Sequence, residues 1–228
     1  MNYCKPIFVA LLILLSSKGY SQEWEVLFDG ANINALRGYK MDTFPTDRWE
    51  VVDGALSTIT DVQNVDIVTK EMYQDFELVF EWKVSKAGNS GVFFHVQEVF
   101  DQEAGNGNSP NWLNDFEFQI LDDIDFYDKD PMRSAGSLYD LITPTNKTLK
   151  QVGEYNTAKL IVKDNHVEHW INGKKVVDYV IGGEALNALL AKSKFKDNPE
   201  YGTSKKGHIM FQHHGQKVWY KNIKIRRL

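Results

Sequence analysis

The sequence predicts an all-β protein, a sandwich of two antiparallel sheets with one short peripheral helix. Apolar and polar residues alternate along most of the chain, which is the period of a half-buried strand. Turn residues separate these runs at close spacing, as they do where short strands follow one another. The chain has 228 residues, 43% of them hydrophobic, and shows no internal repeat or break in composition. We therefore expect one domain with a large core.

The clearest strand covers residues 76–84, where apolar residues alternate with Glu and Lys. Turn residues 86–91 follow it and lead into a second strand at 92–97, and this pair is predicted to form a hairpin. Further strands are expected near 24–28, 155–163, 208–213 and 217–225.

Two-residue turns predict two more hairpins. Asp53-Gly54 lies between β-rich flanks, and Asn172-Gly173 joins strands at 166–171 and 174–180. Asp-Gly and Asn-Gly favour these turns because both dipeptides tolerate the positive φ angles that a twisted hairpin needs.

Two segments depart from the alternation. Residues 99–114 are rich in Gly, Asn and acids and are predicted to be a loop, whereas leucines at helical spacing in 184–195 predict a short helix on the edge of the sandwich. Trp112, inside the loop, is the tryptophan that we expect to line a site. The tryptophans in strand patterns are expected to serve packing.

Residues 1–21 are predicted to be a secretory signal peptide, which leaves 22–228 as the domain. Lys5 precedes the apolar run 7–15, and small or polar residues continue to Ser21, where cleavage is expected. This apolar run is too short for a membrane span, which needs about 20 residues. We therefore expect a periplasmic or secreted protein without a membrane span.

Charge and cysteine content exclude several classes of function. The formal net charge is −5, and removal of Lys5 and Lys18 with the signal peptide makes it −7. Without a basic cluster, such a chain is a poor partner for nucleic acid. Cys4 is the sole cysteine and lies in the predicted signal peptide. Disulfides, thiol catalysis and cysteine metal ligands are therefore excluded from the mature domain.

Histidine spacing argues against a catalytic transition metal. His166 and His169 fall on opposite faces of one strand, and so do His213 and His214. No histidine pair has the helical spacing of a zinc site. The acidic turns leave a bound calcium ion open.

The segment 115–123 is the most informative one for function. Asp115, Glu117 and Gln119 share one face of the expected strand, and the opposite face is fully apolar. Glu117 and Asp122 have a spacing similar to the carboxylate strand of laminarinase-type retaining glycosidases. In a regular strand, however, the two lie on opposite faces with backbones roughly 16 Å apart, whereas a retaining pair needs about 5–5.5 Å between carboxyls. A strand end held by Asx turns is the alternative for Asp122.

The penultimate strand offers a second polar set. Alternation places Gln212 and His214 on its less apolar face, where they could mirror Glu117 and Gln119 across the sheet. Gly215 follows and permits close approach of a ligand to the backbone. The alternative for His214, taken alone, is an exposed residue at a strand end.

Nine short segments follow one another along the mature chain in an order that is similar to a known family: Leu27–Gly30, Trp49–Leu56, Gly88–Val92, Glu117–Asp122, Gly136–Tyr139, Gly153–Asn156, His169–Gly173, Phe211–Gly215 and Tyr220–Ile223. Together they resemble the 3-keto-disaccharide hydrolase domain, and the resemblance implies a concanavalin A-like jelly roll. Departures from the family pattern are His95, Tyr155 and Lys221, where Arg, Trp and Arg are usual. Loss of the Arg at His95 removes a bidentate donor, which is expected to change which sugar or anion is held.

The resemblance implies hydrolysis of a glycosidic bond in a sugar that carries a ketone at C3, a substrate supplied by an upstream sugar 3-oxidoreductase. The ketone acidifies the C2 proton, so a base can remove it, the C1 group leaves, and water then adds. Glu117 and His214 are expected to share the roles of base and proton donor, in either order. The expected substrate-binding residues are Asn89, His95, Gln119, Asp122, Tyr139, Asn156 and Gln212. No cofactor is required, and calcium is left open.

Other functions remain as alternatives. The same sandwich serves as a non-catalytic, lectin-like carbohydrate-binding module, which would bind unoxidised glycans without turnover. A conventional glycosidase of the laminarinase type would cleave an ordinary disaccharide without prior oxidation. A purely structural interaction domain would leave the two polar sets unexplained.

Overall fold

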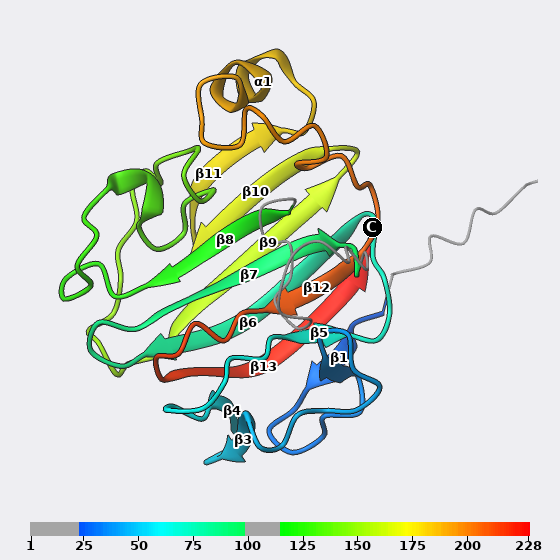
Figure 1. The fold of residues 1–228 in the computed structure, drawn as a ribbon, viewed down its shortest axis with the longest axis vertical. Coiled ribbons are helices and arrows are strands. Elements are labelled where there is room, and N and C mark those ends of the chain that lie inside the picture. The colour runs from blue at the N-terminus through cyan, green and yellow to red at the C-terminus, as the bar shows by residue number, and fades with distance from the viewer. Residues whose placement is uncertain (1–22, 99–114) are drawn as a thin grey trace, which may run out of the picture.

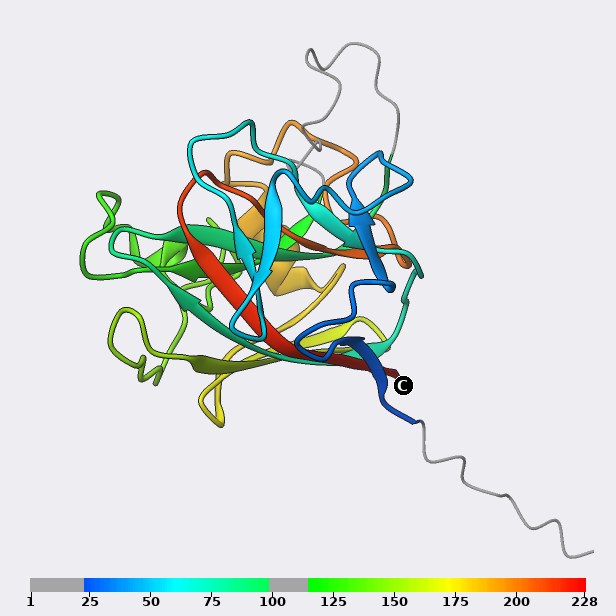
Figure 2. The same ribbon diagram turned by 90° about the horizontal axis from the view of Figure 1, so that it is seen from below.

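A computed structural model describes residues 23–98 and 115–228, which form a two-layer sandwich (Figures 1 and 2). The all-β prediction is confirmed, because the described residues form two antiparallel sheets and a single α-helix. The predicted signal peptide and the predicted loop 99–114, with Trp112, lie outside the described residues. Within the described part of the chain, no helix has the length and apolar character that a membrane crossing requires.

The larger sheet has eight strands in the order β11-β10-β9-β6-β13-β4-β3, and β1 pairs with β13. Its strands are β1 (Glu25–Phe28), β3 (Trp49–Val52), β4 (Ala55–Thr58), β6 (Phe76–Val84), β9 (Asn156–Lys163), β10 (His166–Ile171), β11 (Lys174–Val180) and β13 (Val218–Arg227).

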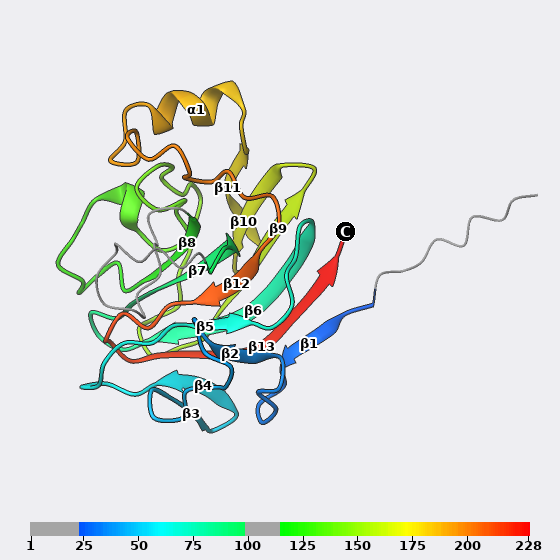
Figure 3. The same cartoon turned by 45° about the vertical axis from the view of Figure 1, so that its right-hand side comes forward.

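The smaller sheet has five strands in the order β2-β5-β12-β7-β8, and Figure 3 shows them side by side in front of the larger sheet. They are β2 (Leu36–Gly38), β5 (Ile67–Thr69), β7 (Asn89–Val96), β8 (Phe116–Leu121) and β12 (His208–Phe211).

Both two-residue hairpins are confirmed. β3 pairs with β4 across Asp53-Gly54, and β10 pairs with β11 across Asn172-Gly173. All four turn residues have positive φ, between 49° and 79°, which is the conformation that the primed hairpin turns require. The predicted helix is confirmed as α1 (Glu184–Leu190), which lies against β11.

The predicted hairpin between 76–84 and 92–97 is wrong. β6 pairs with β9 and β13, whereas β7 pairs with β8 and β12 in the other sheet. The turn between them crosses from one layer to the other, so the apolar faces of the two strands meet across the core. Phe76 of β6 and Phe94 of β7, for example, have ring centroids 6.2 Å apart. Alternation identified both strands correctly, but their pairing depends on where each apolar face finds its partner.

The core fills the space between the two sheets, and a second apolar cluster covers part of the outer face of the smaller sheet. This outer cluster contains Tyr39, Val68, Phe93, Val96 and Met210. As a result, every residue of β5, β7, β8 and β12 is buried. Polar side chains on the outer face of this sheet are therefore held away from bulk water, where their charged forms are costly.

Candidate active site

The register of three strands creates a gap on the outer face of the smaller sheet. Gly91 of β7 pairs with Gln119 of β8, and on its other side the N–H of Gln212 donates to the Gly91 carbonyl at 2.9 Å. These three residues lie in one cross-strand row, and the middle one has no side chain. Because Gly91 has no side chain, it forms the floor of a cavity between Gln119 and Gln212.

The cavity has a volume of about 180 Å³. All of its lining side chains are polar, and they come from β7, β8, the segment after β8 and the end of β12: Asn89, Glu117, Gln119, Tyr139, Gln212 and His214. The structure therefore brings together six of the nine residues that the sequence analysis named. The faces predicted by alternation in β8 and β12 are confirmed, because Phe118, Ile120 and Phe211 lie in the core.

Glu117 lies over the gap, and its side chain is 6% exposed. A Cβ atom placed on Gly91 would lie 2.0 Å from Glu117 Oε1, so the carboxyl occupies the space that any other residue at 91 would fill. Burial raises the pKa of Glu117 to about 8, Lys194 opposes this rise, and Asp66 adds to it. At pH 7 a group with this pKa is protonated about ten times more often than not.

Gln119 orients Asn89. Its Nε2 donates to Asn89 Oδ1 at 2.9 Å in a buried contact. An amide has one oxygen and one NH2 group, so this bond leaves the NH2 group of Asn89 as the donor for a ligand. Gln119 Oε1 is buried and has no hydrogen-bond partner among the described residues.

Tyr139 closes one side of the cavity, and its backbone N–H donates to the Glu117 carbonyl at 3.1 Å. Lys194 Nζ lies 4.2 Å from the centroid of its ring, and the Arg133 guanidinium lies 5.9 Å from it. Both cations pair with Asp140, at 3.3 and 2.6 Å. Burial, with the nearby Glu117, raises the pKa of Tyr139 to about 12. Its hydroxyl therefore keeps its proton at neutral pH and can donate to a ligand.

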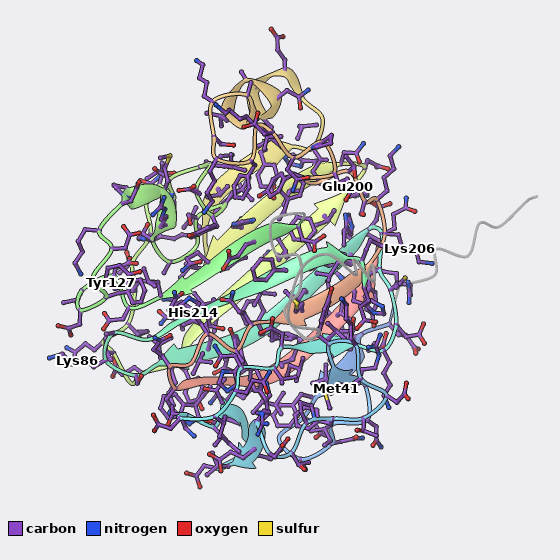
Figure 4. All side chains as sticks on the ribbon, viewed as in Figure 1. Met41, Lys86, Tyr127, Glu200, Lys206 and His214 are labelled. Atoms are coloured by element: carbon purple, nitrogen blue, oxygen red, sulfur yellow. The ribbon has the colours of Figure 1, made fainter. Side chains whose placement is uncertain are left out.

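His214 is exposed and lies in the loop between β12 and β13 (Figure 4). Its Nδ1 is 2.8 Å from Gln216 Oε1. An amide oxygen only accepts, so this contact fits the tautomer with its proton on Nδ1, in which Nε2 carries the lone pair. Inside the sandwich, Ser90 Oγ donates to the Gln212 carbonyl at 2.6 Å and contacts Tyr220 Oη at 2.7 Å, which fixes the strand end before His214.

Asp122 is not brought to the cavity. Its carboxylate accepts the backbone N–H groups of Ala87, Ile124 and Asp125 at 2.8, 2.9 and 3.2 Å. The Asx-turn alternative for this strand end is thus confirmed. A retaining pair of Glu117 and Asp122 is not formed, because Glu117 lines the cavity whereas Asp122 binds backbone N–H groups outside it.

His95 and Asn156 also lie away from the cavity. His95 is buried against Phe76 and Phe94, and its Nε2 is 2.7 Å from the Gln74 carbonyl. Asn156 Oδ1 accepts the Lys150 N–H at 2.9 Å and Asn172 Nδ2 at 2.8 Å. These contacts tie His95 Nε2 to the Gln74 carbonyl, and Asn156 Oδ1 to one backbone and one side-chain N–H group. Neither residue therefore lines the cavity with Glu117.

Sequence reasoning missed three residues that lie under or beside the cavity: Gly91, Asp66 and Lys194. Gly91 ends the predicted turn 86–91, whereas the structure places it inside β7, where its partners come from strands distant in the sequence. Asp66 directly precedes β5, a strand too short to show alternation. Burial raises the pKa of Asp66 to about 7, and its Oδ1 accepts the His213 N–H at 2.6 Å. Lys194 follows α1 and carries no local signal.

A separate cluster could hold a cation on the outer face of the larger sheet. Ligand atoms of His166, Glu168 and Asp178 lie within 4.8 Å of one another, but Lys175 pairs with both carboxylates. His169, on the opposite face of the same strand, is fully buried, and its Nδ1 is 3.0 Å from the Gly136 carbonyl. The prediction that His166 and His169 lie on opposite faces of one strand is therefore confirmed.

Chemically, the cavity suits proton transfer. It combines a buried carboxyl that is largely protonated at neutral pH, an exposed imidazole with one available lone pair, and amide and phenol donors. Among the described residues, no second carboxylate lines it. Two carboxylates across a glycosidic bond, the arrangement of ordinary glycosidases, are absent from this cavity as described.

Comparison with known proteins places the chain among carbohydrate-active proteins. A family model described as a 3-keto-alpha-glucoside-1,2-lyase-like domain matches residues 23–226. A protein named 3-keto-disaccharide hydrolase from Bacteroides thetaiotaomicron is 32% identical to this chain. The alignment, gaps included, is 251 residues long and covers all of this chain and 86% of that protein. The crystal structure of a candidate glycosyl hydrolase from Parabacteroides distasonis has a TM-score of 0.80 at 29% identity, covering 90% of this chain and 94% of that one.

More distant structures share the fold alone. A family GH16 endo-β-1,3(4)-glucanase has a TM-score of 0.51 at 7% identity, with 89% of this chain and 90% of that one covered. The carbohydrate-binding module CBM66 from Bacillus subtilis has a TM-score of 0.52 at 10% identity, with 84% and 95% covered. The jelly-roll sandwich is thus confirmed. Because the fold serves both an enzyme and a binding module, the residues of the site and not the fold determine the function.

Proposed function

We propose that this chain, which belongs to the family of 3-keto-alpha-glucoside-1,2-lyase-like domains, cleaves the glycosidic bond of 3-keto-glycosides in the cavity above Gly91. The observation that carries this proposal is the convergence of Glu117 and His214 on one small polar cavity that no second carboxylate lines among the described residues. Such a site fits a substrate whose own ketone activates it. An ordinary glycoside would need a second carboxylate as nucleophile or base.

The reaction begins with loss of the C2 proton to a base, which the ketone at C3 permits by spreading the charge into an enolate. The electron pair then forms a C1–C2 double bond, and the C1–O bond breaks as the leaving oxygen takes a proton. Water adds its hydroxyl to C1 and a proton to C2. The products are a 3-keto sugar and an alcohol, so the net change is hydrolysis.

His214 fits the base and Glu117 the proton donor. The Nε2 lone pair of His214 is available while its Nδ1–H is held by Gln216, and Glu117 with its pKa of about 8 carries a proton at neutral pH. A proton donor works best when its pKa lies near the working pH. Asn89, Gln119, Gln212 and Tyr139 then hold the enolate oxygen and the sugar hydroxyls.

Two names among the comparisons support this sequence of steps. The family description refers to a 1,2-lyase, which describes elimination across C1 and C2, and the Bacteroides relative is named a hydrolase. Elimination followed by addition of water connects the two names in one reaction. We extend it to this chain as part of the proposal.

Partners and location follow from the chemistry and the sequence. The balance of the steps needs no redox cofactor, because the ketone is already present, and an upstream sugar 3-oxidoreductase would introduce it. The predicted signal peptide suggests that the reaction takes place in the periplasm or outside the cell. Activity after treatment with a chelator, compared with activity after calcium is added back, tests whether a metal takes part.

The decisive experiment compares a glycoside with its 3-keto derivative, side by side, on the purified protein in D2O. We expect cleavage of the keto compound alone, with deuterium at C2 of the product above the level of an enzyme-free control. The Glu117→Gln variant should fold normally and lose turnover. Full activity of this variant, or cleavage of the unoxidised glycoside, would contradict the proposal.

The same experiment separates the alternatives. Binding of unoxidised glycans without turnover of either compound would favour a lectin-like module. Cleavage of the ordinary disaccharide without incorporation of deuterium at C2 would favour a conventional glycosidase.

A further inference from the structure

A buried acid lies next to the cavity without lining it. Phe211 of β12 pairs with Ile67 of β5, so the preceding residue, Asp66, is the cross-strand neighbour of Gln212. The Asp66 side chain is hydrogen-bonded to the backbone N–H of His213 at 2.6 Å. Its own carbonyl accepts the Tyr39 N–H at 2.8 Å. Asp66 thus touches the chain directly between two lining residues of the cavity.

We propose that Asp66 is a positioning residue of this site, which fixes the strand end that carries Gln212 and His214 and uses its negative charge to keep the proton on Glu117. The catalytic meaning of the inference rests on the proposed function. The effect of the Asp66 charge on the titration of Glu117 can be measured in the folded protein without any substrate.

The geometry supports the mechanical part. His213 and His214 follow β12, which ends at Phe211, and a chain that leaves a sheet loses the ladder bonds that would hold it. The Asp66 carboxyl replaces one such bond, and His213 Nε2 is anchored 2.9 Å from the Ile59 carbonyl. The imidazole of His214 is therefore presented from a fixed backbone.

The electrostatic part follows from distance and burial. Asp66 directly precedes β5 and Glu117 lies in β8, three strand positions away on the same face of the sheet, which corresponds to roughly 14 Å. Both are buried, so water screens their interaction weakly. Like charges oppose each other, and ionisation of Asp66 therefore makes ionisation of Glu117 harder, as the contribution of Asp66 to the raised pKa of Glu117 indicates.

Three titratable neighbours of Asp66 in the described part of the chain stay neutral near pH 7. Tyr39 and Tyr220 both interact electrostatically with Asp66, and burial raises the pKa of each well above neutrality. Burial lowers the pKa of His213, so its ring is uncharged. Asp66 ionises with a pKa of about 7 and Glu117 with a pKa of about 8. The charge that Asp66 gains on ionisation therefore acts mainly on Glu117.

The test is a titration of the Glu117 carboxyl carbon by 13C NMR, with its signal assigned as the one absent from Glu117→Gln. In Asp66→Asn the amide oxygen still accepts the His213 N–H, but the charge is gone. We expect the midpoint of Glu117 to fall by a little less than one pH unit, roughly the effect of one charge at about 14 Å in a protein. Asp61→Asn is the matched control, since Asp61 is exposed on a turn of the same segment and changes the net charge equally.

The inference stands if Asp66→Asn lowers the midpoint and Asp61→Asn leaves it in place. It is overturned if both variants shift the midpoint equally, or if neither shifts it. As a second variant, Asp66→Ala should lower the midpoint and also move the amide resonances of His213 and His214, since it removes the acceptor. Failure of the wild-type protein to cleave 3-keto-glycosides would refute the proposed function and leave this titration to decide the coupling on its own.

Discussion

The carboxyl group of Glu117 rests directly on the backbone of Gly91, and the two residues come from neighbouring strands. A side chain of even one carbon at Gly91 would overlap Glu117 Oε1 at 2.0 Å. Glycine is usually explained by its conformational freedom, but the φ of Gly91 is not in the positive range that favours glycine. What this position requires is the absence of a Cβ atom, because that space holds the acid.

Gly91→Ala should therefore impair the site far more than the fold. The added methyl group displaces the Glu117 carboxyl, and a shift of about 1 Å in a reacting group can cost about 100-fold in rate. Overpacking should cost about 1–3 kcal/mol of unfolding free energy. The measurements are kcat on a 3-keto-glycoside and urea unfolding.

A double variant checks the cause of this loss. Glu117→Asp shortens the acid by one methylene group, so Gly91→Ala combined with Glu117→Asp should recover part of the stability lost in Gly91→Ala. Full activity of Gly91→Ala, or equal stability of the single and double variants, would show that the overlap is relieved elsewhere.

Three buried carboxyls should make the protein less stable as the pH rises from 6.5 to 8. Burial raises the pKa of Asp66 to about 7 and those of Asp115 and Glu117 to about 8. The folded state therefore holds protons that the unfolded state has already lost, and the free energy of unfolding falls with pH. Each group contributes up to about 1.4 kcal/mol per pH unit within its range.

The pH window is chosen to isolate these acids. The buried histidines, such as His169 with a pKa lowered to about 4, destabilise the fold only as the pH falls below about 6.5. Urea unfolding at pH 6.5, 7.25 and 8 measures the slope. Asp115→Asn should flatten it, whereas Asp61→Asn, at an exposed position, should leave it unchanged. A free energy of unfolding that rises from pH 6.5 to pH 8 would refute the assignment.

His214→Gln should lower kcat about 10²–10⁴-fold, the range for loss of a general acid or base. The side chain is exposed, so the melting temperature should stay within about 1 °C of wild type, since surface substitutions are usually neutral. Gln216→Ala removes the acceptor of Nδ1 and should reduce kcat less, because the ring remains but loses its orientation. Equal activity of His214→Gln and wild type would remove His214 from the mechanism.

Asp122→Ala should lower stability and leave kcat unchanged, the opposite of His214→Gln. Three backbone N–H groups lose their acceptor, and at about 1 kcal/mol for each hydrogen bond the unfolding free energy should fall by about 3 kcal/mol. Below the unfolding transition, kcat should be close to wild type. A collapse of kcat in a stably folded Asp122→Ala protein would restore the carboxylate pair with Glu117.

The sequence by itself determined the strands, their faces and the local turns. Alternation in β8 and β12 assigned Glu117, Gln119, Gln212 and His214 to polar faces, because the period of a strand is a local property of the backbone. Asn172-Gly173 marked its hairpin for the same reason, since a two-residue turn depends only on its own φ angles. The resemblance in ordered segments then indicated the family and hence the jelly roll.

Only the tertiary structure decided which of these residues meet. β6 and β7 face each other across the core instead of pairing, and Asp122, His95 and Asn156 form hydrogen bonds outside the cavity that Glu117 lines. Gly91 and Asp66 became part of the site through pairings with β8 and β12, strands far away in the chain. Such pairings follow from how whole apolar faces pack together, and no short stretch of sequence contains that information.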